Sequence, residues 1–269
     1  MNSICLFVHY STKESLPYYV VIYVNELARF FDELRLITNK RKIDNLSCLN
    51  DNISIQFEKN EGYDFGKIYK GLKAIEPTNY KTIAFINDSN VIINKLDAVF
   101  EWGKNNQSDF WGIIDSNEKP WFSTNKDNYH IQSHFMVLNE NAISLLTEYY
   151  NSIDVDAIFN ITDLKELRRE VIDKWEIGFT QFLINNGVKT SAYIDSCKFR
   201  KEHKSKKKNI AHEHYGELLE EGYPLIKKKI LFNRTWRRFL GQQESWEKAI
   251  HTYLNTEWDR EKLLKDVIE

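Results

Sequence analysis

The sequence predicts an α/β fold, and three observations lead to that prediction. Short apolar runs typical of buried strands recur along the chain, at 4–8, 81–86 and 109–114. Stretches with helical periodicity separate them, beginning with 17–31. Hydrophobic residues make up 42% of the 269 residues, which suffices for a large core. Strands that alternate with helices indicate a mostly parallel sheet with helices on both faces.

The remaining elements follow from the same patterns. Pro17 suits the first turn of the helix at 17–31 because its φ is already helical. Gly187 suits the C-terminal cap of a later helix. The other expected strands are 33–38, 53–57, 133–138 and 188–194. The other expected helices are 67–75, 96–103, 142–150, 164–171 and 177–185.

The pattern changes beyond Asp195. Residues 198–208 carry seven Lys or Arg and one Glu, a charge run that predicts a solvated loop. Residues 225–239 are mixed apolar and basic, and short helices are expected at 246–254 and 259–268. We therefore expect a core at 1–197 and a basic, helical extension at 198–269 that packs on it.

Composition narrows the class of protein. A net charge of −2 does not indicate a nucleic-acid partner. Cys5, Cys48 and Cys197 match no zinc spacing, and they suit a reducing compartment. Neither a signal peptide nor an apolar window of about 20 residues is evident. We expect a cytoplasmic protein whose basic tract contacts the inner face of the cell membrane.

Polar residues follow the expected strands, where ligands bind in parallel sheets. Tyr10 and Ser11 follow the first strand and can hold a nucleotide base or a phosphate, or simply cap the next helix. Asn87, Asp88 and Asn90 follow the strand at 81–86. The carboxylate of Asp88 can bind a divalent cation on a diphosphate, or a ribose. A helix N-cap at Asp88 explains it equally well.

A glycine-rich segment at 60–66 precedes an expected helix. Gly62, Asp64 and Gly66 lie in it, and its backbone amides can contact a nucleotide sugar at the positive end of the helix dipole. The plainer interpretation is a tight loop in which Gly62 and Gly66 adopt positive φ.

Further strand-end and helix-end residues are candidates. Asp115 follows the strand at 109–114, and Glu176 precedes the helix at 177–185. Either carboxylate can act as a general base, although Glu176 can equally complement the helix dipole. Gln132 can contact a sugar. Lys227 and Lys228 can bind a diphosphate, or belong to a solvated charge run.

Six ordered segments carry a resemblance to a known family. They are 61–66 (EGYDFG), 86–89 (INDS), 109–116 (DFWGIIDS), 130–135 (HIQSHF), 175–178 (WEIG) and 222–227 (GYPLIK). Their order and spacing over roughly residues 1–230 resemble those of the rhamnan-synthesis F-type glycosyltransferases of bacterial cell-wall, capsule and lipopolysaccharide clusters.

The resemblance implies a GT-A-like fold, a nucleotide-sugar donor and a saccharide acceptor. It implies that Asp88 occupies the acidic donor-site motif, with Asp88 and Asn90 as ligands of Mg²⁺ or Mn²⁺. The motif reads Asp88-Ser89-Asn90 here, and an asparagine is a weaker ligand for these ions than a carboxylate.

The resulting hypothesis is transfer of a sugar from dTDP-rhamnose or a UDP-hexose to a growing, lipid-linked cell-surface polysaccharide or lipopolysaccharide glycan. Glu176 is the expected base, with Asp115 as its rival. The expected donor contacts are Tyr10, Ser11, Gly62, Asp64, Gly66, Asn87, Asp88, Gln132, Lys227 and Lys228. The alternative is a non-catalytic carbohydrate-binding or assembly subunit. A nucleic-acid-binding module that uses the basic tract is a weaker third hypothesis.

Overall fold

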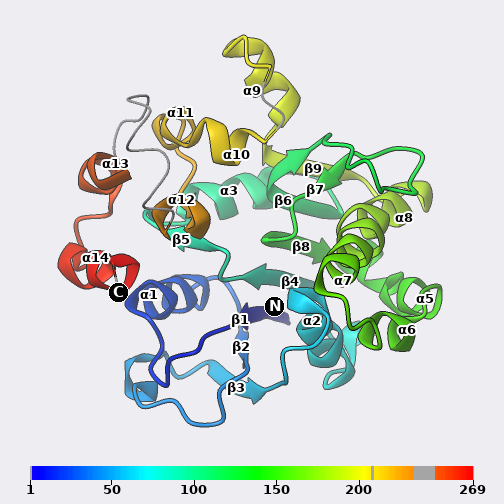
Figure 1. Ribbon diagram of the computed structural model, residues 1–269, viewed down its shortest axis with the longest axis horizontal. Helices are drawn as coiled ribbons and strands as arrows, with labels where there is room; N and C mark the ends of the chain where they lie inside the picture. The colour runs from blue at the N-terminus through cyan, green and yellow to red at the C-terminus, as the bar shows by residue number, and fades with distance from the viewer. Residues whose placement is uncertain (1, 207–208, 233–245, 269) are drawn as a thin grey trace.

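A computed structural model describes residues 2–206, 209–232 and 246–268 of the chain. At its centre lies an eight-stranded sheet in the order β3-β2-β1-β4-β8-β6-β7, with β9 paired to β6 (Figure 1). The strands are β1 (Ser3–His9), β2 (Glu33–Thr38), β3 (Ile53–Phe57), β4 (Thr82–Asn87), β6 (Phe110–Ser116), β7 (His130–Ile131), β8 (Phe135–Asn139) and β9 (Thr190–Ile194).

The expected α/β fold with a mostly parallel sheet is confirmed. β1 pairs in parallel with both β2 and β4, β2 with β3, and β6 with β9. β8 runs antiparallel between β4 and β6, which makes the sheet mixed. The central strand β1 is buried along its whole length, as a strand covered on both faces must be.

Helices cover both faces of the sheet. They are α1 (Tyr18–Leu27), α2 (Tyr63–Lys73), α3 (Asp97–Asn105), α4 (Glu140–Ser144), α5 (Leu146–Asn151), α6 (Val155–Phe159), α7 (Leu164–Glu170), α8 (Phe179–Asn185), α9 (Ser196–Glu202), α10 (Ile210–Glu213), α11 (Tyr215–Glu220), α12 (Lys228–Phe232), α13 (Trp246–Tyr253) and α14 (Arg260–Ile268). Short 3₁₀ turns occupy Leu46–Cys48 and Pro77–Asn79.

Alternation along β1 divides the core into two hydrophobic clusters. Cys5 and Phe7 pack on the face covered by α1 and α3, whereas Leu6 and Val8 pack on the face covered by α2, α4 and α8. Residues from α10 to α14 join the first cluster, so the C-terminal part of the chain completes a core that the N-terminal part begins. In the part of the chain that the structure describes, no helix is both long and apolar enough to span a bilayer.

The expected helices at 164–171 and 177–185 form one continuous helical segment. A π-helix, Val171–Gly178, connects α7 to α8, and the residues at both junctions have right-handed helical φ and ψ. Glu176 therefore lies inside a helix, and the interpretation of it as a partner for a helix N-terminal dipole is wrong. Two other expected helices differ in their bounds. The helix expected at 67–75 is α2, which begins at Tyr63, and the stretch at 142–150 divides into α4 and α5.

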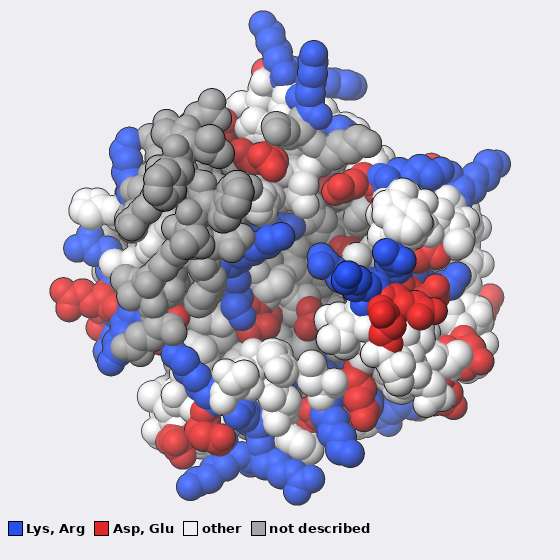
Figure 2. All heavy atoms as spheres, in the orientation of Figure 1, with Lys and Arg blue, Asp and Glu red and all other residues white. Residues whose placement is uncertain are grey.

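The solvated loop expected at 198–208 is wrong in its first half, which is helix α9. Asp195 caps that helix by accepting hydrogen bonds from the backbone N–H groups of Cys197 and Lys198, both at 2.9 Å. Phe199 anchors the helix to the core. Basic side chains project from the edge of the molecule where Figure 1 shows α9 (Figure 2). Lys207, Lys208 and 233–239 of the expected basic and mixed segments lie outside the described residues.

A small second sheet was not expected from the sequence. β5 (Asn90–Ile92) pairs antiparallel with β10 (Leu225–Lys227). The backbone N–H of Lys228 then donates to the carbonyl of Ser89 at 2.9 Å. This pairing carries residues 225–228 to the carboxyl end of β4, more than half the chain away in sequence.

Candidate functional site

Asp88 lies at the carboxyl end of β4, directly beside the end of β1. Its backbone N–H donates to the carbonyl of Val8 at 3.1 Å, and its side chain is buried. One carboxylate oxygen accepts a hydrogen bond from Nζ of Lys228 at 2.9 Å. A charge pair in a largely buried position is stable only when both partners are present. Asp88 and Lys228 therefore form a pre-arranged pair at the strand end.

Tyr19 on α1 completes the surroundings of this pair. Its hydroxyl oxygen accepts a hydrogen bond from Nζ of Lys228, and the ammonium lies 5.2 Å from the centre of its ring. The Asp88 carboxylate raises the pKa of Lys228 against the opposing effect of burial. Lys228 is thus held as a cation.

A second lysine enters the same region from α2. Lys67 is fully buried, and its Nζ donates to the backbone carbonyl of His9 at 2.7 Å. Burial lowers the pKa of Lys67, while the carboxylates of Asp64 and Asp88 act in the opposite direction. Burial lowers the pKa of His9 to about 4, so its imidazole is neutral at physiological pH.

Asp64 lies in the first turn of α2 and faces these groups. Burial and, after it, the Asp88 carboxylate raise the pKa of Asp64, Lys67 and Lys228 act against that rise, and the net result is a pKa of about 7. A carboxyl group that titrates near neutral pH beside two cations is typical of a functional site.

The glycines around Asp64 serve close packing. Gly62 precedes α2 with φ of +67°, as expected. Gly66 lies inside the helix, so the expectation of positive φ there is wrong. A Cβ on Gly66 would lie 1.8 Å from the carbonyl oxygen of Glu61. The backbone N–H of Gly66 donates a hydrogen bond to the carbonyl of Gly62. Residues 60–62 therefore precede the helix and residues 63–66 form its first turn, and the donor contacts expected from the backbone amides of this segment stay a prediction.

Glu176 and Lys227 form the second part of the site. One carboxylate oxygen of Glu176 accepts from the backbone N–H and the hydroxyl of Ser133, at 3.2 and 3.1 Å. Nζ of Lys227 donates to the side-chain oxygen of Gln132 at 3.1 Å. Burial lowers the pKa of Lys227, and the charge of Glu176 partly offsets this. Glu176 also raises the pKa of Asp64, so the two parts interact electrostatically.

The carboxylate of Asp115 contacts a different element from those around Asp88 and Glu176. It is buried, and one carboxylate oxygen accepts from the backbone N–H of Ser196 at 2.7 Å. The hydroxyl of Tyr129 also bonds to it, and burial raises its pKa. These contacts hold the start of α9.

The residues after β1 and those after β4 differ from one another in exposure. Tyr10 is exposed, with its ring centre 5.4 Å from Nζ of Lys67. Ser11 is linked to Asn39 by two hydrogen bonds through its backbone. Asn87 accepts from the N–H of Ser89 at 3.0 Å, which shapes the turn into β5. Asn87, Asp88 and Asn90 are buried rather than exposed, because β10 pairs with β5 beside them.

The structure also tests whether Asp88 and Asn90 suit a divalent cation. Asp88 is paired with Lys228, and Asn90 is fully buried in β5 with a side-chain oxygen that has no hydrogen-bond partner. Within the described ranges, no group of three or more His, Cys, Asp and Glu side chains is arranged to hold a metal ion. This donor set fits Mg²⁺ or Mn²⁺ poorly, and a metal ion at Asp88 and Asn90 stays a prediction.

Figure 2 shows a hollow near the centre of this face, over the sheet region around β4 and β8 in Figure 1, with acidic and basic side chains around it.

Three residues of the cluster around Asp88 were not candidates from the sequence. His9 ends an apolar strand, and Lys67 interrupts the apolar face formed by Phe65 and Ile68, so both carried a weak signal. Tyr19 carried none, because a tyrosine on an apolar helix is ordinary core.

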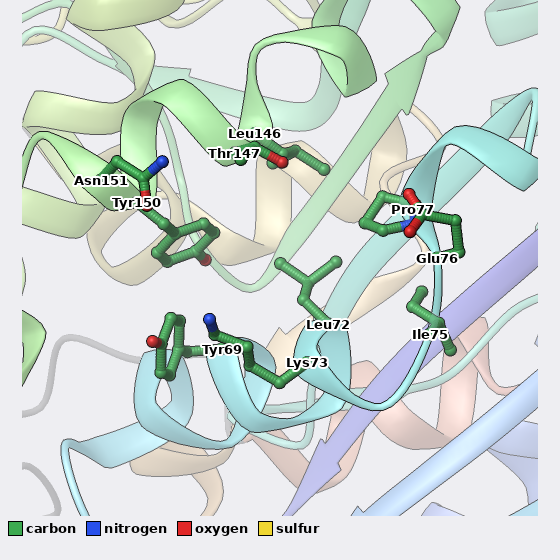
Figure 3. A pocket seen from close by; sticks show the side chains of 10 residues that line it. All are labelled: Tyr69, Leu72, Lys73, Ile75, Glu76, Pro77, Leu146, Thr147, Tyr150 and Asn151. Carbon is green, nitrogen blue, oxygen red and sulfur yellow. The ribbon is translucent and has the colours of Figure 1, made fainter.

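Two of the pockets that the described residues form lie away from this cluster. One of about 180 Å³ lies between the C-terminal half of α2 and α5, and Tyr69, Lys73 and Tyr150 are among its lining side chains (Figure 3). Another, of about 670 Å³, is lined by aromatic and charged side chains at the amino ends of β1 and β4. Neither includes a candidate site residue.

Comparisons with known proteins give a family for the chain. The model of the family described as rhamnan synthesis protein F matches residues 36–265. No curated protein sequence matches the chain significantly.

The solved structures that resemble this one do so at low identity. A Bacillus anthracis protein described as a glucose-1-phosphate thymidylyltransferase is 10% identical over 72% of this chain and 86% of its own, with a TM-score of 0.45. The galactosyltransferase LgtC, solved with donor and acceptor sugar analogs, is 12% identical over 97% of this chain and 100% of its own, with a TM-score of 0.41. These TM-scores are too low to support an argument about function.

Proposed function

Because the chain belongs to the rhamnan synthesis protein F family and is therefore a glycosyltransferase, we propose that it transfers a sugar from dTDP-rhamnose or a UDP-hexose to a growing, lipid-linked cell-surface glycan. The observation that supports the donor site best is the buried Asp88–Lys228 pair at the carboxyl end of β4, with Lys67 and Asp64 beside it. Ligands of such sheets bind at this edge.

The chemistry of transfer requires positive charge where the leaving nucleoside diphosphate gains negative charge. Lys227 and Lys228, which are adjacent in the chain, supply this positive charge. Asp88 holds the ammonium group of Lys228, and Gln132 holds that of Lys227. Pre-arranged charges of this kind stabilise a transition state without reorganisation during the reaction. Asp64, whose pKa is about 7, takes up a proton when the negatively charged diphosphate binds beside it.

The acceptor hydroxyl needs a base as it attacks the sugar. Glu176 is held by Ser133 through one carboxylate oxygen only, which leaves the second oxygen as a proton acceptor. Asp115 is the weaker candidate because its carboxylate serves the start of α9. The donor contacts expected at Tyr10, Ser11 and Asn87 remain proposals, with Tyr10 the best placed of the three because it is exposed beside Lys67.

A thermal-stability screen against a panel of nucleoside-diphosphate sugars, with and without Mn²⁺, tests the donor site. The true donor should raise the Tm, since a ligand at 100 times its Kd stabilises the folded state by about 2.7 kcal/mol. Asp88→Asn and Lys228→Met should lower kcat/KM by about 100-fold or more, and Lys104→Met, an exposed lysine elsewhere, should not.

Two results would contradict the proposal. One is the absence of stabilisation by every nucleoside-diphosphate sugar in the panel, and the other is full turnover by Asp88→Asn at saturating donor and acceptor. Binding of oligosaccharides without binding of any nucleotide would instead indicate the carbohydrate-binding subunit.

A further inference from the structure

Among the residues that the structure describes, Trp121 is the most exposed large hydrophobic side chain, at 81%. It lies on the connection between β6 and β7, beside Phe122, with ring centres 5.7 Å apart in an edge-to-face arrangement. The guanidinium of Arg169, at the end of α7, lies 4.7 Å from the centre of the Trp121 ring. Arg169 thus lies over one face of the indole, and the other face is open to solvent as a flat surface on which a ring can stack.

The connection that carries Trp121 is fixed to the π-helix. Buried Asp173 accepts hydrogen bonds from the backbone N–H and the hydroxyl of Thr124, at 2.8 and 2.5 Å. The side-chain amide of Asn125 donates to both the carboxylate and the backbone carbonyl of Asp173, each at 2.9 Å. Trp121 is therefore presented from an anchored segment and not from a free loop.

The same helical segment carries Glu176. Arg169 and Glu176 are seven residues apart in one continuous helical segment. Asp173 lies between them in sequence. Glu176 accepts a hydrogen bond from the backbone N–H of Ser133, and Asp173 accepts one from the backbone N–H of Thr124. Irregular π-helical turns of this kind occur frequently at functional sites. The segment thus connects the proposed base to the aromatic surface.

We propose that Trp121 and Arg169 form an acceptor subsite that binds a sugar ring one or more units away from the ring that receives the transferred sugar. The apolar C–H face of the distal ring stacks on the indole face opposite Arg169, and the guanidinium holds the indole in place from the other side. This inference rests on the proposed function, because Glu176 marks where the reacting hydroxyl lies.

Acceptor length is the variable that tests the subsite. Methyl rhamnoside and rhamnose oligosaccharides of increasing length serve as acceptors for the wild type, Trp121→Ala, Trp121→Phe and Arg169→Ala. Trp121→Ala should raise the acceptor KM about tenfold for the longer oligosaccharides, the order expected for losing one aromatic stacking contact, with kcat unchanged. Methyl rhamnoside should show no difference, and Trp121→Phe should recover part of the loss.

The matched control is Leu46→Ala, which removes another exposed apolar side chain, 45% exposed, from a turn remote from α7. It should leave every KM unchanged. Hydrolysis of the donor without acceptor should also be unchanged in Trp121→Ala. The subsite is overturned if Trp121→Ala alters no acceptor KM at any length, or if it lowers donor hydrolysis in parallel with transfer.

A binding measurement separates this inference from the proposed function. The protein is labelled with 5-fluorotryptophan, and the ¹⁹F resonance of Trp121 is assigned by its loss in Trp121→Phe. The rhamnose oligosaccharides should shift that resonance, and an unchanged resonance at saturating concentration overturns the subsite. If instead the wild type binds no nucleotide sugar in the screen, the proposed function fails, whatever the resonance shows.

Discussion

At the level of single residues, Asp64 is the side chain most affected by its neighbours. Its pKa rises from 3.8 to about 7, because burial and the Asp88 carboxylate both disfavour its charge. Between these two values the folded protein holds a proton that the unfolded chain has released. The contribution of Asp64 to the free energy of unfolding therefore falls as the pH rises from about 4 to about 7, and stays low above that range.

Asp64→Asn should remove this pH dependence. At pH 8 the variant should unfold at a Tm a few degrees above that of the wild type, and the difference should shrink toward pH 4 (roughly, from the usual relation between stability and Tm). Differential scanning calorimetry of both proteins across this range measures it, with exposed Asp51→Asn as the control. Parallel Tm curves for wild type and Asp64→Asn would contradict the shifted pKa. A loss of donor binding should accompany the gain in stability.

The two rival carboxylates should separate into a structural and a functional residue. Asp115→Ala leaves the buried N–H of Ser196 without an acceptor, which costs about 1–3 kcal/mol of stability. Glu176→Gln keeps an oxygen for Ser133 but loses the base, so turnover should fall about 100-fold with little change in Tm. Thermal unfolding and single-turnover kinetics on both variants test this. If folded Asp115→Ala lost its turnover while Glu176→Gln kept it, Asp115 would take the role of base.

At the level of elements, the start of α2 depends on a close approach between helix and loop. Gly66→Ala should destabilise the fold by about 2 kcal/mol or more, because the added Cβ meets the backbone carbonyl of Glu61 and only a backbone shift relieves the contact. The same shift would move Asp64 and Lys67, so donor binding should weaken as well.

Gly216→Ala provides the matched substitution for Gly66→Ala. Gly216 lies in helix α11, and nothing lies within 4 Å of an added Cβ. Its replacement should be neutral or stabilise the protein by up to about 1 kcal/mol. Urea denaturation of both variants gives the comparison, and equal midpoints would show that the contact at Gly66 has no energetic effect.

At the level of the whole molecule, basic side chains gather on α9 at one edge (Figure 2). Lys198, Lys201 and Lys204 are exposed there. We propose that this edge contacts an anionic membrane surface, where each lysine contributes about 1 kcal/mol. Reversal of all three to Glu should therefore reduce binding to phosphatidylserine-containing vesicles by at least about 100-fold in a sedimentation assay.

The control for this experiment reverses Lys59, Lys81 and Lys104, which are exposed at other places on the molecule. It alters net charge by the same amount and should reduce vesicle binding much less. Equal losses in the two triple variants would indicate a general charge effect, and the absence of vesicle binding by the wild type would contradict the membrane contact.

The sequence by itself determined the α/β class, most strand and helix positions, and the place of Asp88 at a strand end. These features depend on local periodicity and on apolar runs, which are complete within a few neighbouring residues. Helix α9 and the π-helix were not predictable in this way. In α9 the charge run masks a short capped helix. The π-helix has the same apolar periodicity as its α-helical neighbours, and its Asp173 contacts the connection between β6 and β7, which lies far away in sequence.

Only the tertiary structure decided which side chains surround Asp88. Lys228 is 140 positions away, and it reaches the carboxylate because β10 pairs with β5. Lys67 and Tyr19 arrive from helices on opposite faces of the sheet. Contacts between residues so far apart in sequence follow from tertiary packing, and no local sequence pattern specifies them. The strand that ends on Asp88 could be predicted because its apolar run lies within a few neighbouring residues.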